Sequence, residues 1–313
     1  MKTNATFNPV LTTLFNGYFD NPEGFVGLRL APLFRTGEQS ASYPVFDREN
    51  FVNIPKLRQR APGTPFQRGT VSFSDDKYAT KNYGHESPVA DEVRKKYAKQ
   101  IDADQAAIKK NARVILFNHE FRVHDLVTGP DVTHRATPAV KWDTYGNNAS
   151  DPIGDVKAAR AVIDIEGGLM PNTLTLGRTV ADKLTLHPKI RQLFPTHNGP
   201  ITEQMLQVAF EIPRVIIAGG KTNTAAEGQA MSIEYLWGDD VILSVSTDSQ
   251  DLEEPNAART FLWTEESGGD EVGSYVETYR QETVKSDIHR SYHHTDEKLT
   301  GKDLIYLLEN VLA

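Results

Sequence analysis

Apolar and polar residues alternate on both sides of a broken, polar segment near the N-terminus. In SYPVFDRENF (42–51) and TVSFSDDKYATKNYG (70–84), apolar residues such as Val71 and Phe73 are separated by polar ones, which is typical of half-buried β-strands. The intervening segment 53–69, NIPKLRQRAPGTPFQRG, contains three prolines and two glycines. An isolated two-stranded ribbon is marginally stable in water. The pattern therefore predicts a protrusion that rests on something outside its own core, such as a partner subunit.

Two helices are predicted after this arm. Ser87-Pro88 is a helix start signal for a segment that runs to about residue 99, because Ser suits the N-cap and Pro the first helical position. Asp102 begins a second capping pattern, and 103–127 contains neither Gly nor Pro. At 1.5 Å per residue this second helix would be roughly 37 Å long. Its half-apolar surface predicts a spine against which other elements pack.

The middle of the chain alternates helical and strand patterns. After one further helix, the predicted elements follow the order strand, helix, helix, strand. This order indicates an α/β or α+β lobe. The segments are a helix at 150–168, a strand at 173–177, short helices at 178–194 broken at Pro188, a helix at 201–212 and a buried strand at 214–220.

From residue 221 the pattern becomes mostly β. Two strands or a hairpin are predicted within 234–245, and a strand within 259–266. The segment 273–294 alternates over a long distance with no strongly apolar face, which is more typical of an interaction ribbon than of a core hairpin. The closing segment 301–313 is predicted to be a short amphipathic element. Its shared face comprises Leu304, Leu307, Leu308 and Val311.

Composition restricts the protein class. The 313-residue chain has a formal net charge of -8, 39% apolar residues and no cysteine, with a mean hydropathy of -0.46 and a pI near 5.6. Disulfides and thiolate chemistry are therefore excluded, and no run of about 18 apolar residues predicts a membrane span. The absence of cysteine fits an intracellular site of synthesis, and it also fits a particle that must survive either redox state. The N-terminal residues lack the apolar core of a signal peptide. The acidic pI argues against a dedicated DNA-binding domain.

The arm at 53–69 has the opposite charge. It carries Lys56, Arg58, Arg60 and Arg68 and no acidic residue. Nucleic-acid binding is one interpretation, but the arm lacks interleaved aromatic residues and a recognition helix. Contact with an acidic neighbour in a lattice is the favoured interpretation. The acidic patches available for it are Asp248, Asp251, Glu253 and Glu254, and Glu265, Glu266, Asp270 and Glu271.

Patterns that carry catalytic chemistry are weak in this sequence. His293 and His294 lie near Asp296 and Glu297, but adjacent residues on a strand point to opposite faces, so exposed polar residues near a strand end are favoured over a metal site. His119 and His124 do not have the HExxH spacing. The stretch AGGKTNT (218–224) lacks the first Gly of a phosphate loop. We therefore expect no catalytic residue, no metal and no cofactor.

The order of elements resembles the major capsid protein of tailed bacteriophages, with the Hong Kong 97 fold. The stretches that carry the resemblance are SYPVFDRENF, the helix at 103–127, PNTLTLGRTVADKLTLHPKIRQLF with its His187-Pro188 step, VIIAGGKTNTAAEGQAMSIEYLWGDDVILSV with Trp237-Gly238, and the closing β segment TFLWTEE to YVETYRQET. The resemblance covers nearly the whole chain and implies an α+β fold.

The resemblance implies a division of the chain into parts. These are an N-terminal arm (1–38), an extended arm called the E-loop (39–85), a peripheral (P) domain with the spine helix 103–127 (86–168), an axial (A) domain (169–257), P-domain strands (258–294) and a C-terminal return to the A domain (295–313). The E-loop would extend over an adjacent subunit, so Lys56, Arg58, Arg60 and Arg68 would meet acids across a subunit interface. Covalent cross-linking through Lys56, as in some relatives, is not expected.

The implied function is a non-enzymatic head protein that forms hexamers and pentamers in an icosahedral shell around double-stranded DNA. Its expected partners are other copies of itself, a separate scaffolding protein, a portal and a decoration or cement protein, with no sequence-specific DNA contact and no membrane. The expected location is the virion, with assembly in the host cytoplasm. The alternatives are an encapsulin-like nanocompartment shell with the same fold and, from other classes, a metal-dependent hydrolase or a nucleic-acid-binding module.

Overall fold

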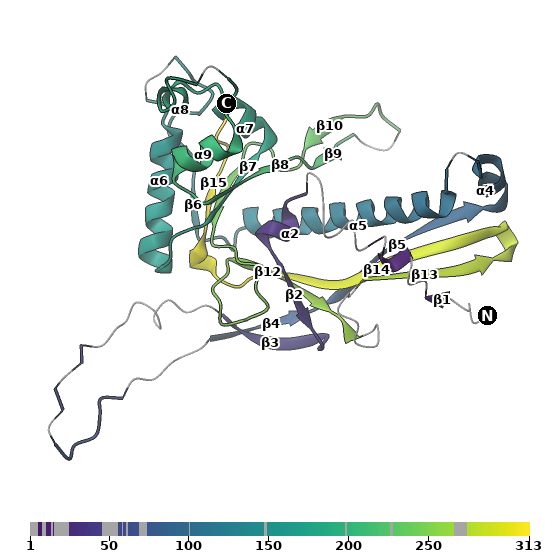
Figure 1. The fold of residues 1–313 in the computed structure, drawn as a ribbon, viewed down its shortest axis with the longest axis horizontal. Coiled ribbons are helices and arrows are strands. Elements are labelled where there is room, and N and C mark those ends of the chain that lie inside the picture. The colour runs from purple at the N-terminus through teal and green to yellow at the C-terminus, as the bar shows by residue number, and fades with distance from the viewer. Residues whose placement is uncertain are drawn as a thin grey trace.

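The computed structural model describes most of the chain. The described residues are 6–7, 11–13, 15, 25–45, 56–57, 59–60, 62–68, 74–99, 101–146, 149–197, 199–225, 228–265 and 274–313. Two lobes lie side by side, with an arm that leaves the molecule near their junction (Figure 1). Among the described helices, none is both long and apolar enough to cross a membrane.

The elongated lobe is built on a six-stranded sheet, and we call it the six-stranded lobe. The sheet has the order β1-β13-β14-β12-β2, and β5 also pairs with β14. Its strands are β1 (Thr6–Phe7), β2 (Leu33–Thr36), β5 (Lys81–Ala90), β12 (Ala258–Trp263), β13 (Ser274–Gln281) and β14 (Ser286–Leu299). The predicted long strand pair is confirmed, because β13 and β14 are antiparallel over Ser274–Gln281.

The predicted spine helix is confirmed as α5 (Ala103–Thr128), which lies along this sheet (Figure 1). Its first turn is capped as expected, since a carboxylate oxygen of Asp102 accepts hydrogen bonds from the backbone N–H groups of Asp104 and Gln105. Two short helices, α2 (Gly27–Leu30) and α4 (Asp91–Tyr97), and the 3-10 turn η3 (Glu282–Val284) belong to the same lobe.

The predicted helix start at Ser87-Pro88 is wrong. Both residues lie in β5, which pairs with β14 through ten residue pairs, and the helix α4 begins only at Asp91. The Ser87 hydroxyl donates to Asn111 Oδ1 on α5 instead of capping a helix. A residue before proline favours extended backbone, and pairing with β14 decides the outcome.

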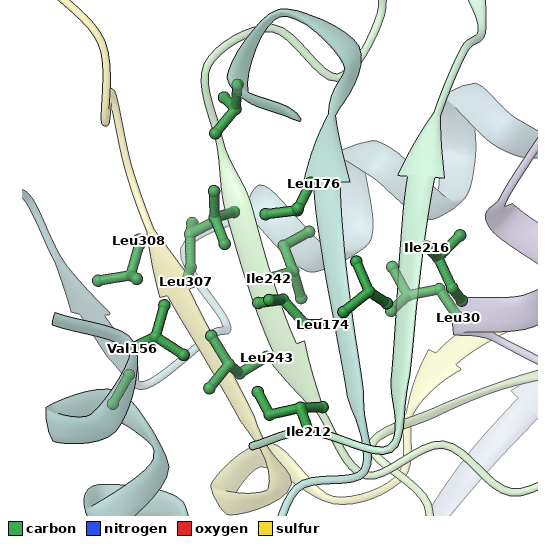
Figure 2. Packing of buried hydrophobic residues seen from close by; sticks show 14 of the residues in the cluster. Leu30, Val156, Leu174, Leu176, Ile212, Ile216, Ile242, Leu243, Leu307 and Leu308 are labelled. Carbon is green, nitrogen blue, oxygen red and sulfur yellow. The ribbon is translucent and has the colours of Figure 1, made fainter. Parts of the chain in front are cut away.

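The second lobe contains a five-stranded sheet of order β6-β15-β11-β7-β8, and we call it the five-stranded lobe. Its strands are β6 (His134–Ala136), β7 (Thr173–Gly177), β8 (Arg214–Ala218), β11 (Val241–Ser244) and β15 (Ile305–Leu308). Its helices are α6 (Pro152–Val162), the π-helical turn η1 (Ile163–Gly167), α7 (Arg178–Leu184), α8 (Pro188–Gln192), α9 (Glu203–Phe210) and the 3-10 turn η4 (Lys302–Leu304). Figure 2 shows the aliphatic side chains that meet in its core.

Of the two alternatives predicted within 234–245, two separate strands are confirmed: β10 (Ile233–Tyr235) pairs with β9 (Lys221–Asn223), whereas β11 joins the five-stranded sheet. Two other sequence expectations need correction. The closing amphipathic element is the strand β15, and it is buried because it lies between β11 and β6. The segment 273–294 is not a two-sided polar ribbon, because β14 is largely buried at the centre of its sheet.

The arm begins and ends as a two-stranded sheet. The strands β3 (Ser40–Val45) and β4 (Ser74–Ala79) pair antiparallel, with Ala41 opposite Tyr78. The described residues 62–68 lie far from both lobes (Figure 1). The predicted strand–arm–strand protrusion is confirmed for the described residues. Residues 46–51 and 70–73 of the predicted strands lie outside the described residues, and 81–84 belong to β5 rather than to the arm.

The lobe boundaries differ from the parts named in the sequence. β6 and α6 lie within 86–168, yet β6 pairs with β15, and α6 residues such as Val156 belong to the core of the five-stranded lobe. Near the N-terminus, Phe15 packs against Ile108 of α5, and Phe7 lies in β1.

Candidate assembly surfaces

The predicted contact residues lie on the projecting arm. Lys56, Arg60 and Arg68 are exposed, and Arg58 lies outside the described residues. The guanidinium of Arg60 lies 4.4 Å from the centre of the Phe66 ring. Within the described part of the chain, none of the three cations forms an ion pair. Their charge is therefore available to a partner.

The base of the arm is fixed to the six-stranded sheet by aromatic residues. The rings of Tyr78 and Phe261 are stacked, 4.3 Å apart with an angle of 5° between them, and Tyr43 lies 4.9 Å from Phe261. Burial, reinforced by the nearby Asp76 carboxylate, raises the pKa of the Tyr43 hydroxyl. The Asp296 carboxylate accepts the backbone N–H of Ala79 at 2.9 Å. These contacts hold both strands at the base, so they set the direction in which the arm leaves the lobe.

One predicted acidic patch is held in shape by a buried arginine. The Arg259 guanidinium donates to the carbonyl oxygens of Ser249, Asp251 and Glu254 at 2.6–2.8 Å. Burial lowers the pKa of Arg259, and the three carbonyls accept hydrogen bonds from three of its five N–H donors. Asp248, Asp251 and Glu253 are exposed on this loop. The loop therefore presents an acidic surface.

The second predicted acidic patch is mostly outside the described residues. Glu265 is described and exposed, whereas Glu266, Asp270 and Glu271 are not described. The contribution of this patch to assembly stays a prediction.

A buried carboxylate joins the spine helix to both lobes. Glu120 of α5 accepts the backbone N–H groups of Val26 and Gly27 near α2 and the Trp237 indole N–H. Burial raises the pKa of Glu120 although these hydrogen bonds lower it. Trp237 precedes Gly238, whose φ of +48° favours glycine. The contact fixes this turn of the five-stranded lobe against the spine helix.

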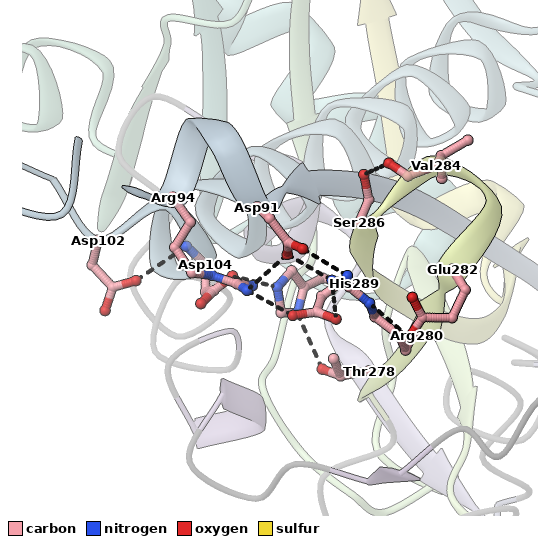
Figure 3. Close-up of polar contacts among 11 residues, drawn as sticks. Asp91, Arg94, Asp102, Asp104, Thr278, Arg280, Glu282, Val284, Ser286 and His289 are labelled. Carbon is pink, nitrogen blue, oxygen red and sulfur yellow. Dashed lines mark hydrogen bonds and ion pairs between the residues drawn. The ribbon is translucent and has the colours of Figure 1, made fainter. Parts of the chain in front are cut away.

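The far end of the six-stranded lobe carries a network of charged residues (Figure 3). Arg280 donates to both carboxylate oxygens of Asp91 at 2.7 Å, which lowers the pKa of Asp91. Arg94 pairs with Asp104 at 2.6 Å and with Asp287 at 2.7 Å. The network links α4, the start of α5 and the β13–β14 turn, so it fixes the end of the lobe.

Asp104 also contacts the buried ring of His289, 2.9 Å away. Burial alone would raise the pKa of Asp104, but the hydrogen bonds from Arg94 and His289 lower it. The other nitrogen of His289 is 3.1 Å from the Thr278 hydroxyl. The first turn of α5 is thereby connected to both strands of the β13–β14 pair.

His293 and His294 are not exposed at a strand end, contrary to the sequence interpretation. Both are buried in the interior of β14. Burial, together with the nearby His119 and Arg122, keeps the pKa of His293 well below its ordinary value. His294 lies edge-on to the Trp263 ring, 5.1 Å away. Within the described residues, no group of three or more acidic or histidine side chains is arranged to hold a metal ion.

His119 lies between the spine helix and the sheet. Its Nε2 is 3.0 Å from the Thr260 hydroxyl and 3.7 Å from a carboxylate oxygen of Glu297. Burial lowers the pKa of His119 to about 4, although Glu297 opposes the shift. Arg122 donates to both oxygens of Glu297 at 2.9 Å. These residues form a buried polar layer between α5 and β14.

Sequence reasoning missed Glu120, Arg259 and the role of Asn111. A signal existed for two of them, because Asn111 and Glu120 fall among the apolar residues of the α5 stripe, next to Ala112 and His119. A polar residue inside an apolar helical stripe is expected to have a buried partner. Arg259 had no such signal, because its partners are backbone carbonyls of a loop.

Comparison with known proteins finds two phage proteins with sequences similar to this chain. The chain is 25% identical over 320 residues to a major capsid protein of Burkholderia phage BcepMu, covering 97% of this chain and 96% of that protein. It is 25% identical over 258 residues to a major capsid protein of Pseudomonas phage JBD67, covering 75% of this chain and 76% of that one. No protein-family profile matches the chain.

The chain is similar over most of its length to two phage major capsid proteins. A solved phage-related protein from Bordetella bronchiseptica RB50 has the same fold, with a TM-score of 0.77, 23% identity and coverage of 98% of both chains. The capsid structure of cyanophage P-SCSP1u matches with a TM-score of 0.57 at 11% identity, over 91% of this chain and 87% of that one. The predicted α+β class and Hong Kong 97 fold are confirmed.

The similarity to capsid proteins also bears on whether the protein is an enzyme. Both curated relatives are named for a structural role in a capsid, which agrees with the expectation of a non-enzymatic protein. The features described above are therefore candidates for assembly surfaces and their supports: a projecting arm, its aromatic base, the acidic loop held by Arg259 and the spine helix.

Proposed function

We propose that this chain is a major head protein that self-assembles into hexamers and pentamers of an icosahedral shell enclosing double-stranded DNA. The observation that carries the proposal is the similarity to a phage major capsid protein over 97% of the chain. The projecting arm supports it, because the arm exposes charge and apolar surface that its own lobes do not cover. A subunit that works alone would gain nothing from such a protrusion.

We further propose the roles of the parts. The arm 39–85 is the E-loop that extends over an adjacent subunit, with Lys56, Arg58, Arg60 and Arg68 near acids of that subunit. The six-stranded lobe is the P domain, and the five-stranded lobe, including β6 and α6, is the A domain. The acidic loop held by Arg259 is one surface that the E-loop cations could meet, since opposite charge across an interface orients the partners.

The remaining partners follow from the same function. We propose a separate scaffolding protein, a portal, a decoration or cement protein, and assembly in the host cytoplasm before the shell becomes part of the virion. The net charge of -8 suits a container that encloses DNA without binding a particular sequence, because like charges limit tight attachment to phosphates. An encapsulin-like shell would share the fold, but the two curated relatives named for phage capsids favour a viral shell.

Electron microscopy of the purified chain, alone and with a candidate scaffold, tests the proposal. Closed particles or capsomer rings are the expected result, and a monodisperse monomer under every condition would contradict it. A variant lacking residues 56–68 is the companion experiment. Because the described residues of this segment lie outside both lobes, we expect the variant to keep the same circular dichroism and melting temperature but to form no closed shells.

A further inference from the structure

The tip of the arm is both apolar and charged. Leu57 is 87% exposed and Phe66 is 74% exposed. The tip is hollowed, and both apolar side chains line the hollow together with Lys56, Arg60 and Pro65. Large apolar side chains at the end of a projecting segment are typical of interaction sites.

The Arg60–Phe66 pair strengthens this interpretation. The guanidinium lies 4.4 Å from the ring centre, a distance at which a cation is attracted to an aromatic face. Aromatic residues and arginine are also the side chains that dominate binding energy at protein interfaces. An exposed ion pair contributes little by comparison, since water and salt screen it. The sequence interpretation of the arm relied on charge alone and overlooked this pair.

The occupant that fits this tip is a second copy of the same chain. The segment 53–69 holds four of the 34 basic residues and none of the 42 acidic ones, so the rest of the chain has 30 basic against 42 acidic residues. The cations around the hollow are therefore opposite in charge to the acidic surface of a neighbouring copy. The exposed carboxylates of Asp248, Asp251 and Glu253, on the loop held by Arg259, show that acidic surface is available.

We propose that Leu57 and Phe66, with Arg60 stacked on the ring, form the anchor by which the arm binds the adjacent copy in the shell. In this arrangement the apolar pair supplies the affinity, and Lys56 and Arg68 orient the arm. The proposal rests on the shell function proposed above. It specifies which arm residues make assembly possible.

Alanine variants measure the anchor directly. We expect Phe66→Ala to raise the lowest protein concentration at which shells form by at least about tenfold, because burial of an aromatic side chain is lost at every contact. Leu57→Ala should act in the same direction. Lys56→Ala and the control Gln39→Ala, an exposed glutamine at the base of the arm and outside the hollow, should change it by less than about fivefold. Circular dichroism and the melting temperature of the unassembled protein should be the same in all four variants.

Fluorescence of Phe66→Trp gives a second readout that does not depend on the loss of assembly. We expect its emission to move to shorter wavelength when shells form, relative to the shift of the unsubstituted protein, because the ring becomes buried. The proposal is overturned if Phe66→Ala assembles at the normal concentration, if Lys56→Ala weakens assembly as much as Phe66→Ala, or if the Phe66→Trp emission does not move. Shells formed without residues 56–68 would overturn the assembly role of this segment itself, so the two failures are distinguishable.

Discussion

The two lobes are stabilised by different means. The core of the five-stranded lobe is mostly apolar: aliphatic side chains such as Leu174, Ile242 and Leu307 (Figure 2) pack with the rings of Trp142 and Phe210. The six-stranded lobe buries polar side chains between α5 and its sheet, such as Asn111, His119, Glu120 and His293. Apolar contacts have no direction, whereas each buried polar group needs a particular partner.

The difference agrees with the separate roles proposed for the two lobes. In the six-stranded lobe, Asn111 of α5 donates to the carbonyl oxygen of His289 and lies close to Ser87 of β5. Such pairings fix the helix in one register on the sheet, because another register would leave buried groups without partners. The lobe that carries the arm therefore depends strongly on single buried partners, and its buried histidines make it sensitive to pH.

The largest expected effect lies in the aliphatic core. Leu174 is fully buried in β7, so Leu174→Ala should lower the free energy of unfolding by about 2–5 kcal/mol. Urea unfolding at concentrations below those for assembly measures the loss, which should be the same at pH 7 and pH 5. A loss that depended strongly on pH would contradict the description of this core as apolar.

Acid should destabilise the six-stranded lobe through its buried histidines. The pKa of His119 is about 4 in the folded protein against 6.5 as the ordinary value, so between these pH values the unfolded chain binds a proton that the folded chain does not. Stability should therefore fall as pH decreases from about 6.5 to 4, by about 3 kcal/mol at most from this residue. His293 shifts in the same direction. Urea unfolding across this pH range provides the measurement.

The matched variant for this prediction is His119→Gln, which keeps a neutral polar side chain near Thr260. It should be less stable at pH 7 but should lose less stability between pH 6.5 and 4, since its side chain does not titrate. An unchanged pH profile would show that His119 does not contribute to acid sensitivity.

A smaller effect is expected at the junction of the lobes. Glu120→Ala removes the acceptor of three donors, from Val26, Gly27 and Trp237. We expect a loss of about 1–3 kcal/mol, because the buried donors are left without partners. Trp237→Phe, which removes a single donor, should cost less. Unfolding monitored by near-ultraviolet circular dichroism compares the two, and a larger loss for Trp237→Phe would point to packing rather than to the carboxylate.

The smallest effect is expected at the exposed end of the six-stranded lobe. Arg280→Ala removes the two hydrogen bonds to Asp91, but these groups are in contact with water, which weakens charge interactions. The melting temperature should fall slightly at low salt, and the difference should vanish near about 1 M salt. A large fall that persists in high salt would show that the network stabilises the lobe more than its exposure suggests.

Several elements could be predicted because their signals are local. The spine helix is uninterrupted by Gly or Pro and has its cap at Asp102, and α5 begins at Ala103 as expected. The strands on either side of the arm were indicated by alternation, and β3 and β4 pair there. In both cases the local preference and the tertiary structure agree.

Other predictions failed where distant partners decide the conformation or the burial. Ser87-Pro88 has a good helix start signal, but residues 81–90 pair with β14. His293 and His294 look like exposed polar residues in the sequence, yet β14 is covered by strands and by α5. A polar strand at the centre of a sheet is recognisable only when its neighbours are known.

By itself the sequence determined the order and type of most elements, the acidic balance and the basic arm, because these depend on short-range periodicity and composition. Only the tertiary structure decided that β14 is central, that Arg259 and Glu120 are buried anchors, and that Leu57 and Phe66 line one hollow. The physical reason is that burial and partnership depend on residues far apart in the chain. Glu120 and Trp237, for example, share a hydrogen bond across 117 positions.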